Sequence, residues 1–190
     1  MKNNNKQQAT SDQLNLQTIS LDSKQEKLRT AQIDQATKQF SEALIKDSFL
    51  TRDELANQVF DRLQIQSELN WQEHAQTCVA ISDIRTRDGL LRIIHDHPEA
   101  REDLRAHLIR EVARAQQEFV APLATVFAGI SWLDGHHEVT RLAVDRALEV
   151  DPAYSLAQLL DIALRHNVPA SVWSSSLAAV SFDACLKGAA

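Results

Sequence analysis

The chain has 190 residues, 44% of them hydrophobic, with only four glycines and four prolines. This composition favours long helices, because β-structure needs more turn residues and more β-branched side chains. The formal net charge is −6, and residues 47–190 hold twenty-one acidic but only thirteen basic residues. An acidic domain lacks the basic face on which nucleic-acid binding depends, so nucleic acid is not an expected partner.

The sequence also disfavours a membrane or secreted protein and a zinc-binding protein. No segment reaches the roughly 18–20 apolar residues of a membrane span, and no apolar stretch follows the charged N-terminus as in a signal peptide. Cys78 and Cys185 stand far apart and lack the spacing of a zinc site, so we expect two reduced thiols. These features predict a soluble, cytoplasmic protein with no membrane partner.

The first 46 residues divide into two segments. Residues 1–22 are rich in polar side chains and offer too little apolar surface to offset the entropy of ordering, so we expect a disordered leader. Residues 23–46 have apolar spacings near three and four, which predict an amphipathic helix. Its thin apolar stripe consists of Leu28, Ala31, Ala36, Phe40, Ala43 and Leu44. Such a helix needs a partner surface, and we expect either the main domain, a second copy or another protein to supply it.

Helix-start signals recur in the next part of the chain. The motif Thr51-x-x-Glu54 has the spacing of a capping box, and Ser67 and Asp83 are the expected caps of the two helices that follow. Gly89 lies inside the third helix and costs up to about 1 kcal/mol relative to Ala. We therefore expect three helices, the third of them short.

The second half continues the helical pattern. His97-Pro98-Glu99 and Pro122 mark helix starts, because proline fits the first turn of a helix. The segment that follows Pro122 is apolar on nearly all sides, which predicts the most buried helix of the protein. Gly135 is suited to end this helix in a left-handed conformation. Helices are then expected over residues 138–149 and 153–166, with Val172-Trp173 packed against the core.

The fold expected for residues 47–190 is all-α, a helical array or bundle of roughly seven to nine antiparallel helices. One hairpin, Trp132–Tyr154, resembles a tetratricopeptide repeat. With Pro152 at the terminal proline of the repeat, its positions for small residues hold Ala128, Gly135 and Ala147. Stacked repeats need about three units, so we expect a single tetratricopeptide-like hairpin inside the bundle.

Five segments carry a longer resemblance: Asp83–Asp88, Ala128–Gly135, Ala143–Leu148, Asp151–Ala157 and Val168–Trp173. In order and spacing they resemble the C-terminal helical half of domain of unknown function 4192, a family of actinobacterial proteins. The resemblance spans about Phe49–Trp173. It implies an architecture but no catalytic residue and no cofactor, because the family has no assigned activity. The chain differs in lacking the N-terminal half of the family, which the polar leader and one helix replace.

The strongest candidate for a catalytic or metal-binding site is the motif His95-Asp96-His97. With Glu99 or Glu102 and with His107 nearby, these histidines could form a His/carboxylate metal site. The motif also lies at a junction between two helices, where His97 fits a cap and turn residue and His95 fits a partner of helix-end carbonyls. The second interpretation is favoured, and His95, His97 and His107 stay as metal candidates.

Three other groups of residues have structural interpretations that we favour over functional ones. His136-His137-Glu138 is interpreted as an exposed turn, to which His166 could contribute. The arginines of Arg85-Thr86-Arg87-Asp88 and Arg92 could bind phosphate, but a salt-bridge cluster with Asp83 or Asp88 is preferred. The expected core anchors are Trp71, Trp132, Tyr154 and Trp173, with Asp134 and Asp151 as local hydrogen-bond acceptors.

These observations leave three hypotheses for the function. The first is a non-enzymatic interaction or scaffolding module that binds another protein, or itself, through the helix at residues 23–46. The second is a metal-dependent or phosphate-handling enzyme that uses the His95/His97 region. The third is a truncated remnant that folds without its parent's function. The absence of a nucleophile motif or an acid–base pair favours the first.

Overall fold

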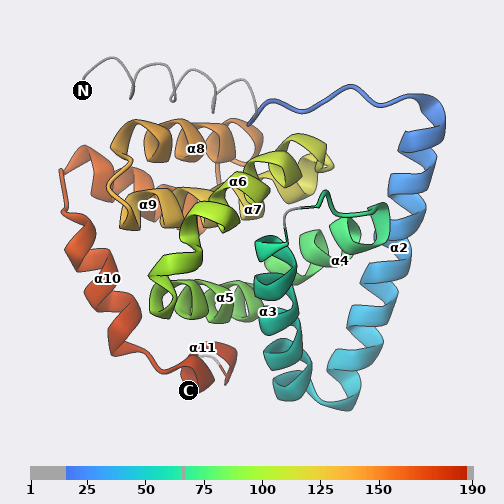
Figure 1. The fold of residues 1–190 in the computed structure, drawn as a ribbon, viewed down its shortest axis with the longest axis horizontal. Coiled ribbons are helices and arrows are strands. Elements are labelled where there is room, and N and C mark those ends of the chain that lie inside the picture. The colour runs from blue at the N-terminus through green and yellow to red at the C-terminus, as the bar shows by residue number, and fades with distance from the viewer. Residues whose placement is uncertain (1–15, 66, 188–190) are drawn as a thin grey trace. The chain divides into compact units, whose positions relative to one another are not determined.

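The protein is all-α, as the sequence predicts. The computed structural model describes residues 16–65 and 67–187, and this part of the chain holds ten α-helices, one 3-10 helix and no strand (Figure 1). Nine of these α-helices, α3 to α11, lie in the described part of residues 47–190, in agreement with the expected seven to nine. None of the helices in the described part is long and apolar enough to cross a membrane. The elements are α2 (Ser23–Lys46), α3 (Ser48–Gln64), α4 (Trp71–Ser82), α5 (Ile84–Asp96), η1 (Pro98–Ala100), α6 (Arg101–Arg114), α7 (Gln117–Leu133), α8 (His137–Val150), α9 (Ser155–Arg165), α10 (Ala170–Ala179) and α11 (Phe182–Lys187).

The helices gather into two compact units. Unit 1 contains the described residues up to Ile19 together with Arg105–Ser176, and unit 2 contains Ser20–Leu104 and the described residues from Leu177 on. The chain passes from one unit to the other between Ile19 and Ser20, within α6, and again within α10. The all-helical body expected for residues 47–190 is thus distributed over both units.

The polar leader expected for residues 1–22 falls mainly outside the described residues. At its described end, Leu16 is buried, and the Ile19 N–H donates a hydrogen bond of 2.8 Å to the Ala113 carbonyl. The Arg146 guanidinium donates to the Leu16 carbonyl at 3.2 Å. These bonds attach the segment before α2 to unit 1.

Unit 1 is built around α7, which packs against α8 and α9. Every residue of α7 from Phe119 to Trp132 is buried, which confirms the prediction of a most buried helix. The predicted start at Pro122 is wrong, because α7 begins at Gln117 and Pro122 lies inside it. A proline in a helix removes one hydrogen bond, but the burial of Phe119 and its neighbours before the proline favours continuing the helix.

The turn after α7 has the predicted left-handed glycine. Gly135 has φ +76°, and its N–H donates to the Trp132 carbonyl at 3.0 Å. Ala128 and Ala147 are fully buried, as expected of small residues where two helices approach closely. The α7–α8 hairpin is therefore observed, while its likeness to a tetratricopeptide unit stays a prediction.

Unit 2 consists of α2 to α5, η1, the start of α6, and α11. Each of its first four helices begins with an acidic or amide side chain that accepts backbone N–H groups of the first turn: Asp22, Asp47, Asn70 and Asp83. The cap at Asp83 was predicted. The caps predicted at Thr51 and Ser67 are wrong, because α3 starts at Ser48 behind Asp47 and α4 starts at Trp71 behind Asn70. The Thr51 hydroxyl instead donates to the Ala43 carbonyl of α2.

The predicted helix α2 has the expected bounds, and its buried face matches the predicted stripe in part. Ala36 is buried and Phe40, Ala43 and Leu44 are half-buried, but Leu28 is 43% exposed and Ala31 is exposed. Arg29 and Ile33 are buried in addition. Burial of Arg29 is tolerated because its guanidinium pairs with Glu26 at 2.6 Å. The apolar face of α2 packs on α4 and α3 of the same chain, so the partner surface that this helix needs lies within unit 2.

Candidate functional site

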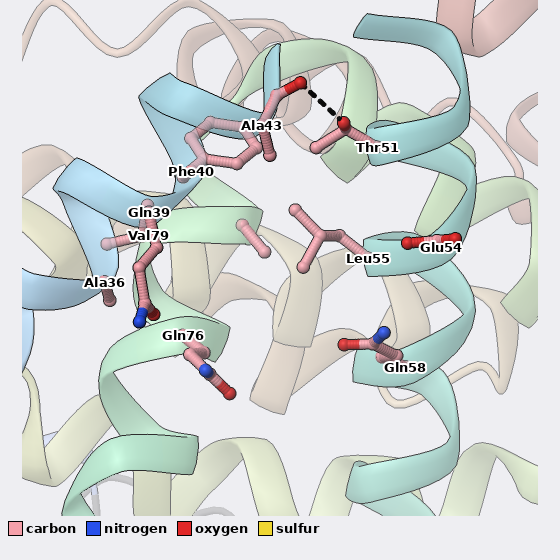
Figure 2. Close-up of a pocket in the computed structure, with 11 residues that line it drawn as sticks. Ala36, Gln39, Phe40, Ala43, Thr51, Glu54, Leu55, Gln58, Gln76 and Val79 are labelled. Atoms are coloured by element: carbon pink, nitrogen blue, oxygen red, sulfur yellow. Dashed lines mark hydrogen bonds between the residues drawn. The ribbon is translucent and has the colours of Figure 1, made fainter. Parts of the chain in front are cut away.

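A pocket opens between α2, α3 and α4 within unit 2 (Figure 2). Its volume is about 180 Å³. Pockets for small-molecule ligands usually measure roughly 300–1,000 Å³, so this one has room for one or two side chains and not for a typical cofactor. The lining residues are Ala36, Gln39, Phe40 and Ala43 of α2, Thr51, Glu54, Leu55 and Gln58 of α3, and Gln76, Val79 and Ala80 of α4.

The turn between α2 and α3 explains why the pocket exists. Asp47 ends α2 and caps α3, because its carboxylate accepts the N–H groups of Phe49 and Leu50, both at 3.0 Å. Because Asp47 is the single residue between the two helices, α3 turns back and packs beside α2. The Thr51 hydroxyl then donates to the Ala43 carbonyl at 3.0 Å and ties the two helices together at one end of the pocket (Figure 2). Farther from this tie, the facing side chains leave a gap.

The wall of the pocket is apolar and its rim is polar. Ala36, Val79 and Ala80 are buried, and Leu55 of α3 reaches toward α2 across the gap (Figure 2). Glu54 and Gln58 are exposed on α3, and further glutamines, Gln39 and Gln76, extend from α2 and α4. Glu54 is the single ionisable side chain among the lining residues of this pocket. The arrangement therefore suits an apolar side chain held among amide hydrogen-bonding groups, and it contains no acid–base pair.

The three histidines considered as metal ligands are not brought together as a ligand group. In unit 2, Nδ1 of His95 lies 3.1 Å from Asp96 Oδ1, and Nδ1 of His97 lies 3.0 Å from Glu99 Oε1. His107 is 2% exposed on α6 and belongs to unit 1. Within residues 16–65 and 67–187, no group of three or more His, Cys, Asp or Glu residues has a geometry that could hold a metal ion.

The His95–Glu99 junction has the structure of a helix end. Arg101 donates to the last carbonyls of α5, those of Ile94 at 3.1 Å and His95 at 2.8 Å. A hydrogen bond from Arg92, reinforced by His95, holds the pKa of the Asp96 carboxyl below its ordinary value. The His97 ring also packs on Phe60, with 5.2 Å between ring centroids. His97 thus lies at the predicted junction between α5 and η1, although its side chain makes no capping hydrogen bond, and Arg101 is a donor to the helix-end carbonyls that the sequence did not suggest.

Two of the three arginines of α5, Arg87 and Arg92, take part in local ion pairs. Arg87 is 6% exposed and pairs with Asp88 at 2.7 Å, as the structural interpretation predicts. Asp83 pairs instead with Arg52 of α3, at 3.0 Å. Arg92 pairs with Asp96 and donates to the Val180 carbonyl at 2.9 Å. The arginines that pair with carboxylates in this way stabilise the helices of unit 2.

A second pocket, of about 440 Å³, lies in unit 1 beside the predicted polar turn. It is lined by His137, Arg141, Leu164, Asn167, Val168 and Pro169. Arg141 pairs with Asp161 at 2.5 Å, and Asp161 also pairs with Arg165 at 2.8 Å. His137 and His166 are exposed, as the turn interpretation requires. Arg141 also lies 3.8 Å from Asp145, so two carboxylates balance the two guanidiniums beside this pocket.

The tryptophans of unit 1 differ from expectation in their hydrogen bonding. Trp132 is 2% exposed, and its ring stacks on that of Trp173, with 6.0 Å between centroids. Asp134 and Asp151 were the expected acceptors, but neither indole Nε1 has a hydrogen-bond partner within the described residues. The two rings thus anchor α10 to α7 by apolar contact.

Sequence reasoning missed several buried polar residues. Cys78 Sγ lies 3.5 Å from His74 Nε2, and both side chains are fully buried on α4; their spacing of four residues was the available signal. On α6, Glu111 is fully buried and its Oε1 lies 3.4 Å from Arg114 Nη1. The spacing of three between opposite charges could have predicted this pair, but not its burial.

Comparison with known proteins shows that the chain belongs to a family described as Domain of unknown function (DUF4192), which matches residues 4–171. The match begins well before Phe49, so it also includes the amphipathic helix α2. No curated protein and no solved structure matches the chain.

Proposed function

We propose that this protein is a protein–protein interaction module that holds an apolar anchor residue of a partner polypeptide in the pocket between α2, α3 and α4. The observation that carries the proposal is the size and lining of that pocket: about 180 Å³, an apolar wall, and a rim of three glutamines. Interfaces are commonly held by a few large side chains that fill such pockets.

The lining also indicates the kind of partner. Glutamine side chains offer both donors and acceptors, so the rim can bind the backbone or polar side chains around an anchor without requiring a particular charge. Glu54 adds one negative charge, and unit 2 holds seventeen acidic and twelve basic residues among those described. We infer a partner segment with one large apolar residue and a neutral or basic surround.

The helix at residues 23–46, now α2, was expected to bind a partner through its apolar stripe. In the proposed function it still contacts the partner, but as one wall of the pocket. The polypeptide partner meets α2 through Ala36, Gln39, Phe40 and Ala43, which are the residues that α2 contributes to the pocket. We place this binding in the cytoplasm, since Cys78 and Cys185 are both free thiols, a state typical of reducing compartments.

A peptide selection tests the function. Peptides are selected from a random library on the full chain and then measured on two variants of α2. Gln39→Trp places a large ring over the pocket, whereas Thr37→Trp places the same ring on an exposed position of α2 that does not line it. We expect the affinity of selected peptides to fall at least tenfold with Gln39→Trp and to stay within twofold with Thr37→Trp. Enrichment of no peptide, or equal binding by both variants, would contradict the proposal.

A further inference from the structure

A second surface of unit 2, distinct from the pocket of α2, α3 and α4, is covered by the short helix α11. This helix packs on α5 and α3. Leu186 of α11 is fully buried, and Phe182 lies one turn before it on the same face. We call the face of α5 and α3 beneath these two side chains the α11 seat.

Gly89 gives the seat its shape. A Cβ atom at this position would lie 2.7 Å from Leu186 Cδ2 and 3.2 Å from Phe182 Cε2, both closer than ordinary contact. The absent side chain therefore makes a recess in α5 into which two apolar residues, four positions apart, fit. This recess also explains why a glycine stands inside a helix, where it disfavours the helical state.

Two polar contacts add to the seat. The Arg92 Nε–H donates to the Val180 carbonyl at 2.9 Å, a bond to backbone that any incoming sequence can provide. The Lys187 ammonium lies 4.9 Å from the centroid of the Phe49 ring, a distance suited to a cation–π contact. The seat thus recognises a short helix with large apolar residues four apart and a basic residue directly after the second.

Helix α10, which precedes α11, has few buried contacts apart from its one tryptophan. Helix α10 has no buried residue and no charged residue, although it is a regular helix of ten residues. Its Trp173 stacks on Trp132, and Val172 is 50% exposed. Release of α11 from its seat would therefore disrupt few contacts beyond those of α11 itself.

We propose that the α11 seat is a docking groove for a short amphipathic helix of a partner protein, and that α11 is its displaceable occupant in the resting chain. The partner helix carries the pattern that α11 shows, two large apolar residues at i and i+4 followed by Lys or Arg. Because α11 is joined to the same chain, it competes with an effective concentration on the order of millimolar. The partner gains access by outcompeting α11.

The test uses the full chain and a synthetic peptide with the sequence of residues 177–187. Binding is followed by NMR through the backbone amide of Gly89. In the double variant Phe182→Ser/Leu186→Ser, α11 loses the side chains that fill the seat, and we expect the peptide to bind at least tenfold more tightly than to the unchanged chain. Adding Gly89→Leu fills the recess and should abolish this binding. Equal binding to the chain with and without the double substitution, or binding that survives Gly89→Leu, would overturn the proposal.

A measurement on the unchanged chain keeps the proposal testable if the double variant does not fold. Amide hydrogen exchange reports local opening, and we expect the amides of α11 to exchange at least 100-fold faster than those of α5. If the amides of α11 are as protected as those of α5, α11 is a fixed part of unit 2. That result would contradict the proposal that a partner helix displaces it. Neither result depends on the pocket at α2, so failure here is separable from failure of the proposed function.

Discussion

The two units specify their helices by different means. In unit 2, each of the helices α2 to α5 begins with a side-chain cap, from Asp22, Asp47, Asn70 or Asp83. Among the described residues of unit 1, the N-cap positions of α7, α8 and α9 hold Gln116, His136 and Tyr154, whose side chains make no capping hydrogen bond. Unit 1 relies instead on burial, with every residue of α7 from Phe119 to Trp132 removed from solvent.

The difference between burial in unit 1 and capping in unit 2 indicates which unit contributes more stability and which can leave a surface free for binding. Burial of a large apolar side chain is worth about 1.5–3 kcal/mol, whereas a cap is worth about 1 kcal/mol. A unit whose helix starts are fixed by caps depends less on filling the space between its helices, and it can keep a surface open to other chains. Both proposed binding surfaces, the pocket of α2, α3 and α4 and the α11 seat, lie in unit 2. The following substitutions test the comparison.

The largest effect is expected in the core of unit 1. Leu123 is fully buried on α7, and Leu123→Ala should lower the free energy of unfolding by about 2–5 kcal/mol, because it removes buried methyl groups and leaves a cavity. Leu159→Ala is the matched control, since Leu159 is 63% exposed on α9 of the same unit and should change stability by no more than about 0.5 kcal/mol. Thermal or denaturant unfolding measures both. Similar effects of the two would refute burial as the main stabilising term of unit 1.

A smaller effect is expected at the hairpin turn of unit 1. Gly135 has φ +76°, and a Cβ atom there would meet nothing within 4 Å, so Gly135→Ala tests backbone conformation alone. We expect a loss of about 1–2 kcal/mol, the cost of a left-handed conformation in a residue with a side chain. Gly135→Asn should lose less, because asparagine tolerates this region. A loss with Asn equal to or larger than that with Ala would show that the turn is limited by something other than φ.

The cap of α4 should contribute about 1 kcal/mol to unit 2. Asn70 Oδ1 accepts the N–H groups of Gln72 and Glu73, both at 3.0 Å, and Asn70→Ala removes both bonds. Asn57 is also exposed, lies within α3 and bonds to Asp53 of the preceding turn, so Asn57→Ala should change the free energy of unfolding by less than half as much. Hydrogen exchange of the first turn of α4 locates the effect. Unchanged exchange there would contradict the role given to the cap.

Part of the fold could be predicted from the sequence because its signals are local or redundant. The all-α class follows from composition, and the buried helix α7 follows from an apolar run that allows no other placement. Gly135 could be assigned because a glycine after an apolar helix has few other uses. Asp83 could be assigned as a cap because an aspartate directly before a helical pattern is a strong helix-start signal.

Other features depend on contacts between distant residues. Thr51 and Asp47 are both good caps, and the choice between them is made by the turn that lets α3 pack on α2. The buried face of α2 matches its apolar stripe only in part because Arg29 is buried, with its guanidinium paired to the exposed Glu26. The recess at Gly89 requires knowledge that α11 returns to α5. The candidate pocket could not be predicted for the same reason, since three helices must be placed before their unfilled space is defined.

The smallest predicted effect concerns the ion pair between α3 and α5 in unit 2. Burial is the largest single influence on Asp83 and opposes its ionisation, but hydrogen bonds from Arg52 and Thr86 together hold the pKa of the Asp83 carboxyl below its ordinary value. A lowered pKa in the folded state means that the stabilisation is fully present above the unfolded pKa of about 4 and is lost as the pH falls through the folded value.

Replacing Asp83 by Asn separates its charge from its capping role. Asp83→Asn keeps an oxygen for the Thr86 N–H, which now bonds at 2.9 Å, but removes the ion pair with Arg52 at 3.0 Å. We expect a loss of about 0.5–1 kcal/mol at pH 7. This difference from the unchanged chain should begin to shrink as the pH falls below about 4 and should vanish below the pKa of Asp83 in the folded chain. Denaturant unfolding at pH 7 and at pH 3 measures it. A difference that persists undiminished at pH 3 would mean that Asp83 acts mainly as a cap, and the charge would then add little to a unit already specified by its helix starts.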